Sequence, residues 1–147
     1  MGRIIESPLG SLEKDLLAIA QQQSYQSNYR AIEYWSRNVP NKNLDDAALQ
    51  QLVPTLKPLC RHYGEFNSYG YVLLAAKNNA EALRIFKLNT MIYPEQPGVF
   101  DSLAEGYERT GNKKEAIANY EKVLGLKPGD ERATKKMAEL KAQMVGL

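Results

Sequence analysis

The chain has 147 residues, of which 44% are hydrophobic and 24% charged, and its formal net charge is +2. These values lie near the averages of globular domains, so they exclude wholesale disorder and a strongly basic nucleic-acid-binding surface. The single cysteine excludes an internal disulfide, and no apolar run approaches the roughly 18 residues of a membrane-spanning helix. The sequence therefore predicts a soluble protein, cytoplasmic or, if a leader has been trimmed, periplasmic.

The first helices in chain order are predicted from apolar spacing. Leucine, isoleucine and alanine recur at helical intervals over residues 12–20, and Ser11 is placed to cap that helix. After a polar stretch, a second helix is predicted over residues 29–35. Both helices belong to an N-terminal extension, residues 1–62, whose pattern is weaker than that of the rest of the chain.

A loop and a proline-containing helix complete the extension. Residues 38–43 are rich in asparagine and predict the loop. A helix is expected from about Leu44, and Pro54 and Pro58 are expected to break or kink it, because proline lacks the backbone donor that a helix interior requires.

From residue 63 onward the sequence repeats itself with a period of 34 residues. A constant offset of this size is typical of stacked helical hairpins, each of which packs on its neighbours. Small residues are expected where two helices of a hairpin cross closely, and a proline ends each second helix. The matched pairs are Phe66 and Phe100, Gly70 and Ala104, Ala82 and Ala116, Phe86 and Tyr120, and Pro94 and Pro128.

The turns and the last helix follow from local signals. Turns are predicted at residues 77–79 and 110–112, where asparagine and glycine tolerate left-handed backbone. A final helix is predicted over residues 131–145 with Asp130 as its N-cap. Its residues in the core positions of a first helix are expected to be Thr134, Met137 and Ala138.

Both copies resemble the tetratricopeptide repeat family. The first reads Phe66-x2-Tyr69-Gly70-x2-Leu73, Ala82-x3-Phe86 and Pro94, and the second reads Phe100-x2-Leu103-Ala104-x2-Tyr107, Ala116-x3-Tyr120 and Pro128. The resemblance implies an all-α, right-handed superhelix with repeats at 63–96 and 97–130 and a capping helix at 131–147. Ala31 and Trp35 reproduce the Ala-x3-aromatic spacing, which predicts a degenerate hairpin in the extension.

A narrower resemblance concerns residues 66–74, 85–89 and 100–105. These segments are similar to the repeat region at the C-terminus of bacterial serine hydrolases of the β-lactamase-like and esterase-like kinds. The resemblance implies, as an alternative function, an accessory or dimerisation domain. Ser11 and Lys14 match the Ser-x-x-Lys nucleophile signature, but the other catalytic elements and a Gly-x-Ser-x-Gly elbow are absent, so no catalytic residue is predicted.

Other chemistry is not predicted either. Cys60 and His62 lie close in sequence, but no further ligands accompany them, so no metal or cofactor is expected. The lysines and arginines between residues 113 and 141 alternate with glutamates, as on a solvated helix face, so nucleic acid is not an expected partner.

The predicted function is binding of a protein or peptide, without catalysis. The sequence also leaves open that two copies of the chain form a homodimer. In this family the first helices of successive hairpins line a groove, which points to Asn67, Tyr71, Leu74, Asp101, Glu105, Arg132 and Lys136. Arg132 and Lys136 match two positions of the family's carboxylate-gripping set, whereas the remaining positions do not match. Tyr71 and Leu74 are expected to be exposed apolar contacts for an amphipathic segment, unless the extension or a second copy covers them; solvent-facing residues without a partner are the other alternative.

Overall fold

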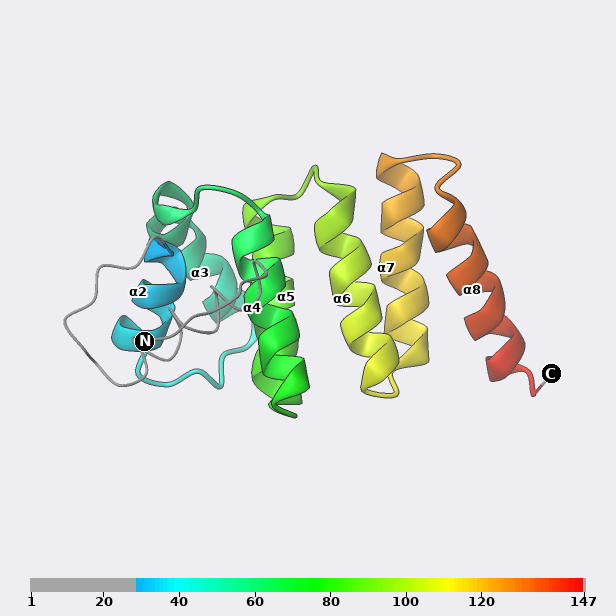
Figure 1. Ribbon diagram of the computed structural model, residues 1–147, viewed down its shortest axis with the longest axis horizontal. Coiled ribbons are helices and arrows are strands. Elements are labelled where there is room, and N and C mark those ends of the chain that lie inside the picture. Colours follow the sequence, from blue (N-terminus) through cyan, green and yellow to red (C-terminus); the bar gives the residue numbers. More distant parts are fainter. Residues whose placement is uncertain (1–28, 147) are drawn as a thin grey trace, which may run out of the picture.

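The computed structural model describes residues 29–146, and in this range helices and short loops account for the fold (Figure 1). The helix predicted over residues 12–20 and its cap Ser11 lie outside the described residues. The elements are α2 (Arg30–Asn38), α3 (Asp46–Leu56), the 3-10 helix η1 (Lys57–Leu59), α4 (Gly64–Ala75), α5 (Asn79–Ile92), α6 (Pro97–Arg109), α7 (Lys113–Leu126) and α8 (Glu131–Met144).

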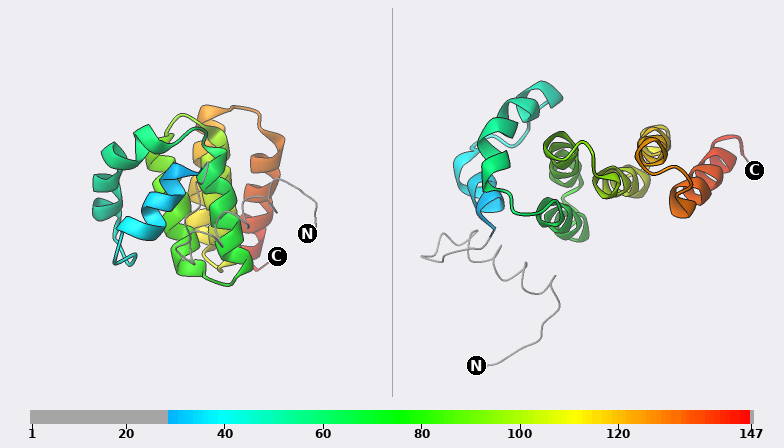
Figure 2. Two further views of the ribbon diagram at one scale, coloured as in Figure 1. Left: turned by 60° about the vertical axis from the view of Figure 1, so that its left-hand side comes forward. Right: turned by 90° about the horizontal axis from the view of Figure 1, so that it is seen from above.

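The helices from α4 onward form a stack of antiparallel hairpins. α4 pairs with α5, α6 pairs with α7, and α8 packs on α7 at the end of the stack (Figure 2). This confirms the predicted fold, an all-α right-handed superhelix of hairpins with a C-terminal capping helix. Neighbouring elements supply most contacts in such a stack, so each hairpin needs the next one to bury its apolar side.

The small residues predicted at the helix crossings lie in the core. Ala82, Ala104 and Ala116 are fully buried. Gly70 faces the ring of Phe86, and a Cβ added there would lie only 2.6 Å from its Cζ atom. The small residues that recur every 34 positions are therefore the residues at which the helices come into close contact.

The helix ends follow the predicted signals. α5 ends at Ile92 and α7 at Leu126, in each case two residues before a proline. In the first hairpin turn it is Lys77 that adopts a positive φ, of 63°, and in the second it is Gly111, with a φ of 85°. The carboxylate of Asp130 accepts a hydrogen bond of 2.8 Å from the backbone N–H of Ala133, which confirms the predicted N-cap of α8.

Of the two prolines predicted to break or kink the helix of the extension, Pro54 does not break it. α3 begins at Asp46, after the N-cap Asp45, and it runs through Pro54 to Leu56. The N–H that Pro54 lacks would have bonded the carbonyl of Gln50, an exposed residue in the same helix. The helix stops two residues later, and Pro58 lies in η1.

The extension shares a core with the first hairpin. Ala31, Ile32 and Trp35 of α2 and Leu49 and Leu56 of α3 are fully buried. They join one cluster with apolar residues of α4 and α5, namely Phe66, Tyr69, Ile85, Leu88 and Ile92. The described part of the extension therefore belongs to the same folded body as the repeats.

A carboxylate joins α2 to this hairpin. The indole Nε1 of Trp35 donates a hydrogen bond of 2.8 Å to Oε2 of Glu81, and the hydroxyl of Tyr69 donates one of 3.2 Å to the same oxygen. Nδ2 of Asn78 donates to Oε1 at 3.1 Å. Glu81 thus satisfies a buried indole N–H that would otherwise lack a partner.

Replacing Glu81 with alanine is expected to lower the free energy of unfolding by about 1–3 kcal/mol, because the buried indole donor of Trp35 loses its acceptor. Trp35 is the only tryptophan, so urea unfolding followed by its fluorescence reports on this junction. The control is Glu121→Ala, at an exposed position on α7, which should stay within about 0.5 kcal/mol of the parent. Equal losses in the two variants would contradict the assignment.

Two of the three residues predicted for the core of α8 are not buried. Ala133 and Leu140 are buried and Met137 is half-buried, whereas Thr134 and Ala138 are exposed. α8 packs on α7, and among residues 29–146 no helix covers its other apolar side. The residues that face α7 are therefore the buried ones.

Candidate partner-binding face

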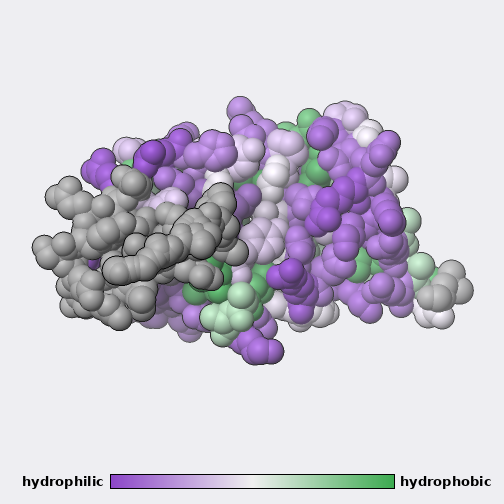
Figure 3. Space-filling view, viewed as in Figure 1, coloured by the Kyte–Doolittle hydropathy of each residue, from purple (hydrophilic) through white to green (hydrophobic). Residues whose placement is uncertain are grey.

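The first helices α4, α6 and α8 lie along one side of the stack, and α5 and α7 along the other (Figure 2). We call this side the first-helix face. Of the residues predicted from the sequence, Asn67 and Tyr71 belong to α4, Asp101 and Glu105 to α6, and Arg132 and Lys136 to α8. Figure 3 looks toward this side and shows hydrophilic surface over α6 and α8.

Two cations of α8 pair with carboxylates of α6. Nε of Arg132 lies 3.1 and 3.2 Å from the two carboxylate oxygens of Asp101, and its Nη2 lies 3.2 Å from Oε1 of Glu105. Nζ of Lys136 lies 3.3 Å from Oε2 of Glu108. Exposed ion pairs of this kind contribute only about 0.2–1 kcal/mol each to stability, so they add little to the packing of α8.

The cations and carboxylates of this face differ in exposure, and this determines which groups a partner would contact. The side chains of Arg132 and Arg109 are about half exposed, at 50% and 53%, whereas those of Asp101 and Glu105 are 21% and 24% exposed. Burial raises the pKa of Asp101 and the adjacent Arg132 opposes that shift. The outermost groups over α6 are therefore guanidinium groups, with the carboxylates beneath them.

Tyr71 connects α4 to the same network. Its hydroxyl donates a hydrogen bond of 2.9 Å to Oε1 of Glu105 and lies 3.3 Å from Oγ of Ser102. Its ring packs edge-on against Phe86 at 5.1 Å between centroids, and the guanidinium of Arg109 lies 5.8 Å from the ring centre. Tyr71 is therefore half-buried, with its hydroxyl held by Glu105 and its ring held by Phe86. It is not the freely exposed apolar side chain that the sequence predicted.

Leu74 does not lie where the sequence placed it. It is only 8% exposed and packs with Ala82, Phe86 and Leu103 in a cluster between the two hairpins. The expectation of an exposed Leu74 is wrong, because this part of α4 faces α6 as well as α5. We do not assign it to the first-helix face.

The side chain of Asn67 is oriented by the buried amide of Asn89 on α5. Nδ2 of Asn89 donates hydrogen bonds to Oδ1 of Asn67 at 3.0 Å and to the carbonyl of Tyr63 at 2.9 Å. Asn89 is fully buried. The contact turns the amide oxygen of Asn67 toward α5 and its amide nitrogen away from α5, as a hydrogen-bond donor.

Sequence reasoning missed two members of this network. Arg109 pairs with Glu105 at 3.3 Å, and Ser102 lies beside the hydroxyl of Tyr71. Their signal was present in the helical spacing, since Arg109 follows Glu105 by four residues and Ser102 precedes it by three. The contact between α4 and α6 that brings in Tyr71 has no such local signal.

Cys60 and His62 do not converge on a site. Burial raises the pKa of the Cys60 thiol to about 11, and Tyr93 lies beside it. The ring of His62 stacks on Tyr63, and its Nδ1 accepts a hydrogen bond of 2.9 Å from the N–H of Gly64. Within residues 29–146, no three His, Cys, Asp or Glu side chains gather as metal ligands would.

Comparison with known proteins adds information on the fold. No protein-family model matches the chain. It is 29% identical over 143 residues to a Skp-like protein of Chlamydia pneumoniae, an alignment that covers 92% of this chain and 76% of that protein. Among solved structures it resembles a mutant of MamA with a TM-score of 0.55 and 16% identity, over 88% of this chain and 85% of the other.

The fold is of the tetratricopeptide type. At 16% identity the likeness to MamA concerns the fold alone. Neither comparison supports the resemblance to the C-terminal region of serine hydrolases, or the alternative function drawn from it. In the part of the chain that the structure describes, no helix combines the length and apolar character needed to cross a membrane.

The partly buried hydroxyl of Tyr71 predicts a loss of stability at alkaline pH. Burial, and to a lesser extent the charge of Glu105, raises the pKa of Tyr71 from 10.0 to about 12, although Ser102 acts in the opposite direction. Because the folded-state pKa is the higher one, the stabilisation is complete below pH 10 and is lost as the pH rises through about 12.

Urea unfolding at about pH 9 and about pH 11 should therefore show a smaller decline for Tyr71→Phe than for the parent, because phenylalanine keeps the ring and cannot ionise. Circular dichroism gives the free energy of unfolding at both values. Identical declines in the two proteins would show that the Tyr71 hydroxyl is not buried against Glu105.

Proposed function

We propose that this chain is a non-catalytic interaction module that binds a segment of another protein on the first-helix face. The tetratricopeptide-type fold supports the proposal, since stacked hairpins of this kind create an extended surface along one side. The proposed organisation is an extension at 1–62, repeats at 63–96 and 97–130, and a capping helix at 131–147.

The observation that carries the proposal is the set of oriented donors on this face. The oxygen of the Asn67 amide is held by Asn89 of α5, which leaves its amide nitrogen as a donor, and Arg109 and Arg132 pair with carboxylates that already neutralise them. Oriented hydrogen-bond donors without net charge suit peptide carbonyl groups. The same neutralisation disfavours nucleic acid, whose binding depends on uncompensated cations.

Site-specific photo-crosslinking in the source cells tests the proposal. A photoreactive amino acid at Asn67 should crosslink to a polypeptide that mass spectrometry can identify. The control is the same amino acid at Ala118, an exposed residue of α7 on the opposite side. Equal crosslinking at both positions, or none at Asn67, would refute the proposal.

The variant Tyr71→Ala provides a second test of the proposed binding face. It removes the hydroxyl that organises Glu105 and the ring beneath Arg109, so the crosslinked product from Asn67 should decrease several-fold. The variant must remain folded by circular dichroism for this comparison. A folded variant with an unchanged yield would place the partner elsewhere.

A further inference from the structure

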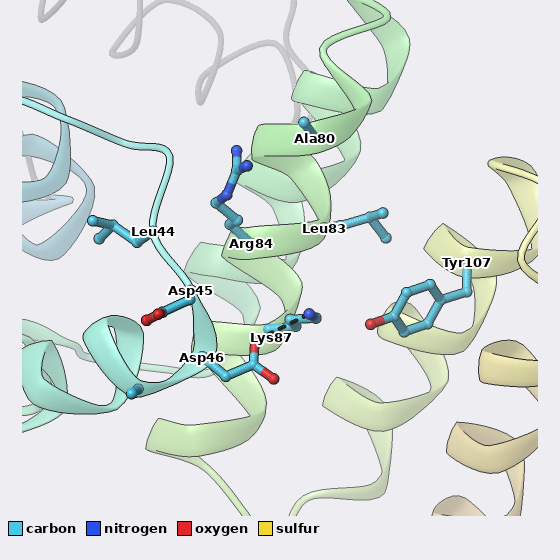
Figure 4. Close-up of a pocket in the computed structure, with 9 residues that line it drawn as sticks. Leu44, Asp45, Asp46, Ala80, Leu83, Arg84, Lys87 and Tyr107 are labelled. Atoms are coloured by element: carbon cyan, nitrogen blue, oxygen red, sulfur yellow. Dashed lines mark hydrogen bonds and ion pairs between the residues drawn. The ribbon is translucent and has the colours of Figure 1, made fainter.

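A cleft of about 670 Å³ lies between the start of α3, the outer side of α5 and the C-terminal half of α6 (Figure 4). Its floor is α5, a second helix, and its lining includes none of the residues assigned to the first-helix face. The repeat pattern does not predict it, because one of its walls is α3, the last α-helix of the extension, which the repeats do not contain. The cleft is thus specific to the way this chain is extended.

Polar contacts hold α3 against α5 and so shape the cleft. Nζ of Lys87 lies 3.1 Å from Oδ1 of Asp46, at the first turn of α3. The guanidinium of Arg84, one turn earlier on α5, donates to the side-chain oxygen of Asn43 in the loop before α3. Figure 4 shows Lys87 extending from α5 toward Tyr107, and Arg84 pointing up from α5 beside the loop that leads into α3.

The lining carries two carboxylates, Asp45 and Asp46, and two cations, Arg84 and Lys87, but Arg84 pairs with neither carboxylate. The carboxylate of Asp45 accepts the N–H of Ala48 at 2.8 Å and so is engaged as the cap of α3. Asp46 pairs with Lys87. Among the ion pairs within residues 29–146, Arg84 has no carboxylate partner, and the group it bonds, Asn43, is neutral.

Apolar surface lies next to this cation. Leu83 and Leu44 are only half-buried, and Ala80 is exposed, although all three line the cleft. In Figure 4 the side chain of Leu83 points toward the ring of Tyr107, on the far side of Lys87 from Asp46. An apolar side chain placed there would be shielded from water on two sides.

We propose that this cleft is a second binding site, which takes a short segment of a partner protein in which acidic and apolar residues alternate. The carboxylate would pair with the guanidinium of Arg84, which offers planar donors that match a carboxylate. The neighbouring apolar side chain would pack on Leu83, Ala80 and Tyr107. This site goes beyond the function proposed for the first-helix face and does not depend on it.

NMR titration of the full ¹⁵N-labelled chain tests the proposal. The probes are two capped hexapeptides, Gly-Leu-Glu-Leu-Glu-Gly and its lysine counterpart Gly-Leu-Lys-Leu-Lys-Gly. The glutamate peptide should shift the backbone amides of α5 from Ala80 to Lys87 and that of Asp46, and the lysine peptide should not. Arg84→Gln should weaken binding of the glutamate peptide roughly tenfold, as for loss of one charge-assisted hydrogen bond.

Lys113→Gln is the matched control, because it removes one exposed charge on α7 and should leave the affinity unchanged. The proposal is wrong if neither peptide shifts α5, if both shift it equally, or if the shifts fall only on α4, α6 and α8. It is also wrong if Arg84→Gln without peptide alters the signals of residues 1–28, since the chain itself would then occupy the cleft.

Discussion

Replacing Phe86 with alanine is expected to lower the free energy of unfolding by about 3–5 kcal/mol, which for a chain of this size is a large part of the total. Phe86 is fully buried at the junction of the two hairpins. Its ring meets Gly70 of α4, Gly106 of α6 and, edge-on, the ring of Tyr71. The cavity would therefore open where three helices meet, and close packing leaves little freedom for them to collapse into it.

Thermal and urea unfolding measured by circular dichroism would give this loss. Met144→Ala is a suitable control, because it also shortens a large apolar side chain but at a position that is 52% exposed. It should change stability by no more than about 0.5 kcal/mol. A loss below about 1 kcal/mol for Phe86→Ala would show that the hairpins do not meet at this ring.

Replacing Gly70 with alanine is expected to destabilise the protein by about 1–3 kcal/mol, even though alanine favours helix by about 1 kcal/mol over glycine. The new Cβ would lie 2.6 Å from Cζ and 2.7 Å from Cδ1 of Phe86. A buried aromatic ring cannot move aside without disturbing its other neighbours. Steric overlap should therefore exceed the gain in helix propensity.

Two other helical glycines make a graded series with Gly70. A Cβ at Gly106 would lie 3.0 Å from Cδ2 of Phe86, so Gly106→Ala should be close to neutral. A Cβ at Gly125 of α7 would meet nothing within 4 Å, so Gly125→Ala should be stabilising by about 0.5–1 kcal/mol. The double variant Gly70→Ala with Phe86→Leu should recover part of the loss. A series ranked in any other order would contradict the packing described at Phe86.

The parts of the fold that could be predicted from the sequence are those encoded by local and repeated spacing. Gly70 and Phe86 have counterparts 34 residues later, and the cap at Asp130 depends on the residues that immediately follow it. Pro54 was misjudged because a proline near the end of a helix removes a hydrogen bond that solvent can replace. The burial of Leu74 was missed because Val72, Leu73 and Leu74 are all apolar, and their order alone does not tell which one faces α6.

The candidate site was predicted less completely than the fold. The first-helix positions, including Asn67, Tyr71 and Arg132, lie on helices that follow one another along one side of the stack. Which of them pair with one another depends on how far α8 and α4 stand from α6, and no local pattern gives that distance. The cleft on α5 was missed for the same reason, since it exists only once α3 has been placed beside Arg84 and Lys87.

The exposed side of α8 has a consequence for how such a protein can grow. Ala138 stands 34 positions after Ala104, which itself matches Gly70, so α8 keeps a small residue at the position where Gly70 of α4 contacts the ring of Phe86. Within the described residues nothing lies over Ala138. A helix with the sequence of α7, joined to α8 by a short turn, could pack on this exposed side of α8. Duplication of one hairpin could therefore lengthen the stack without changes to the sequence of α8.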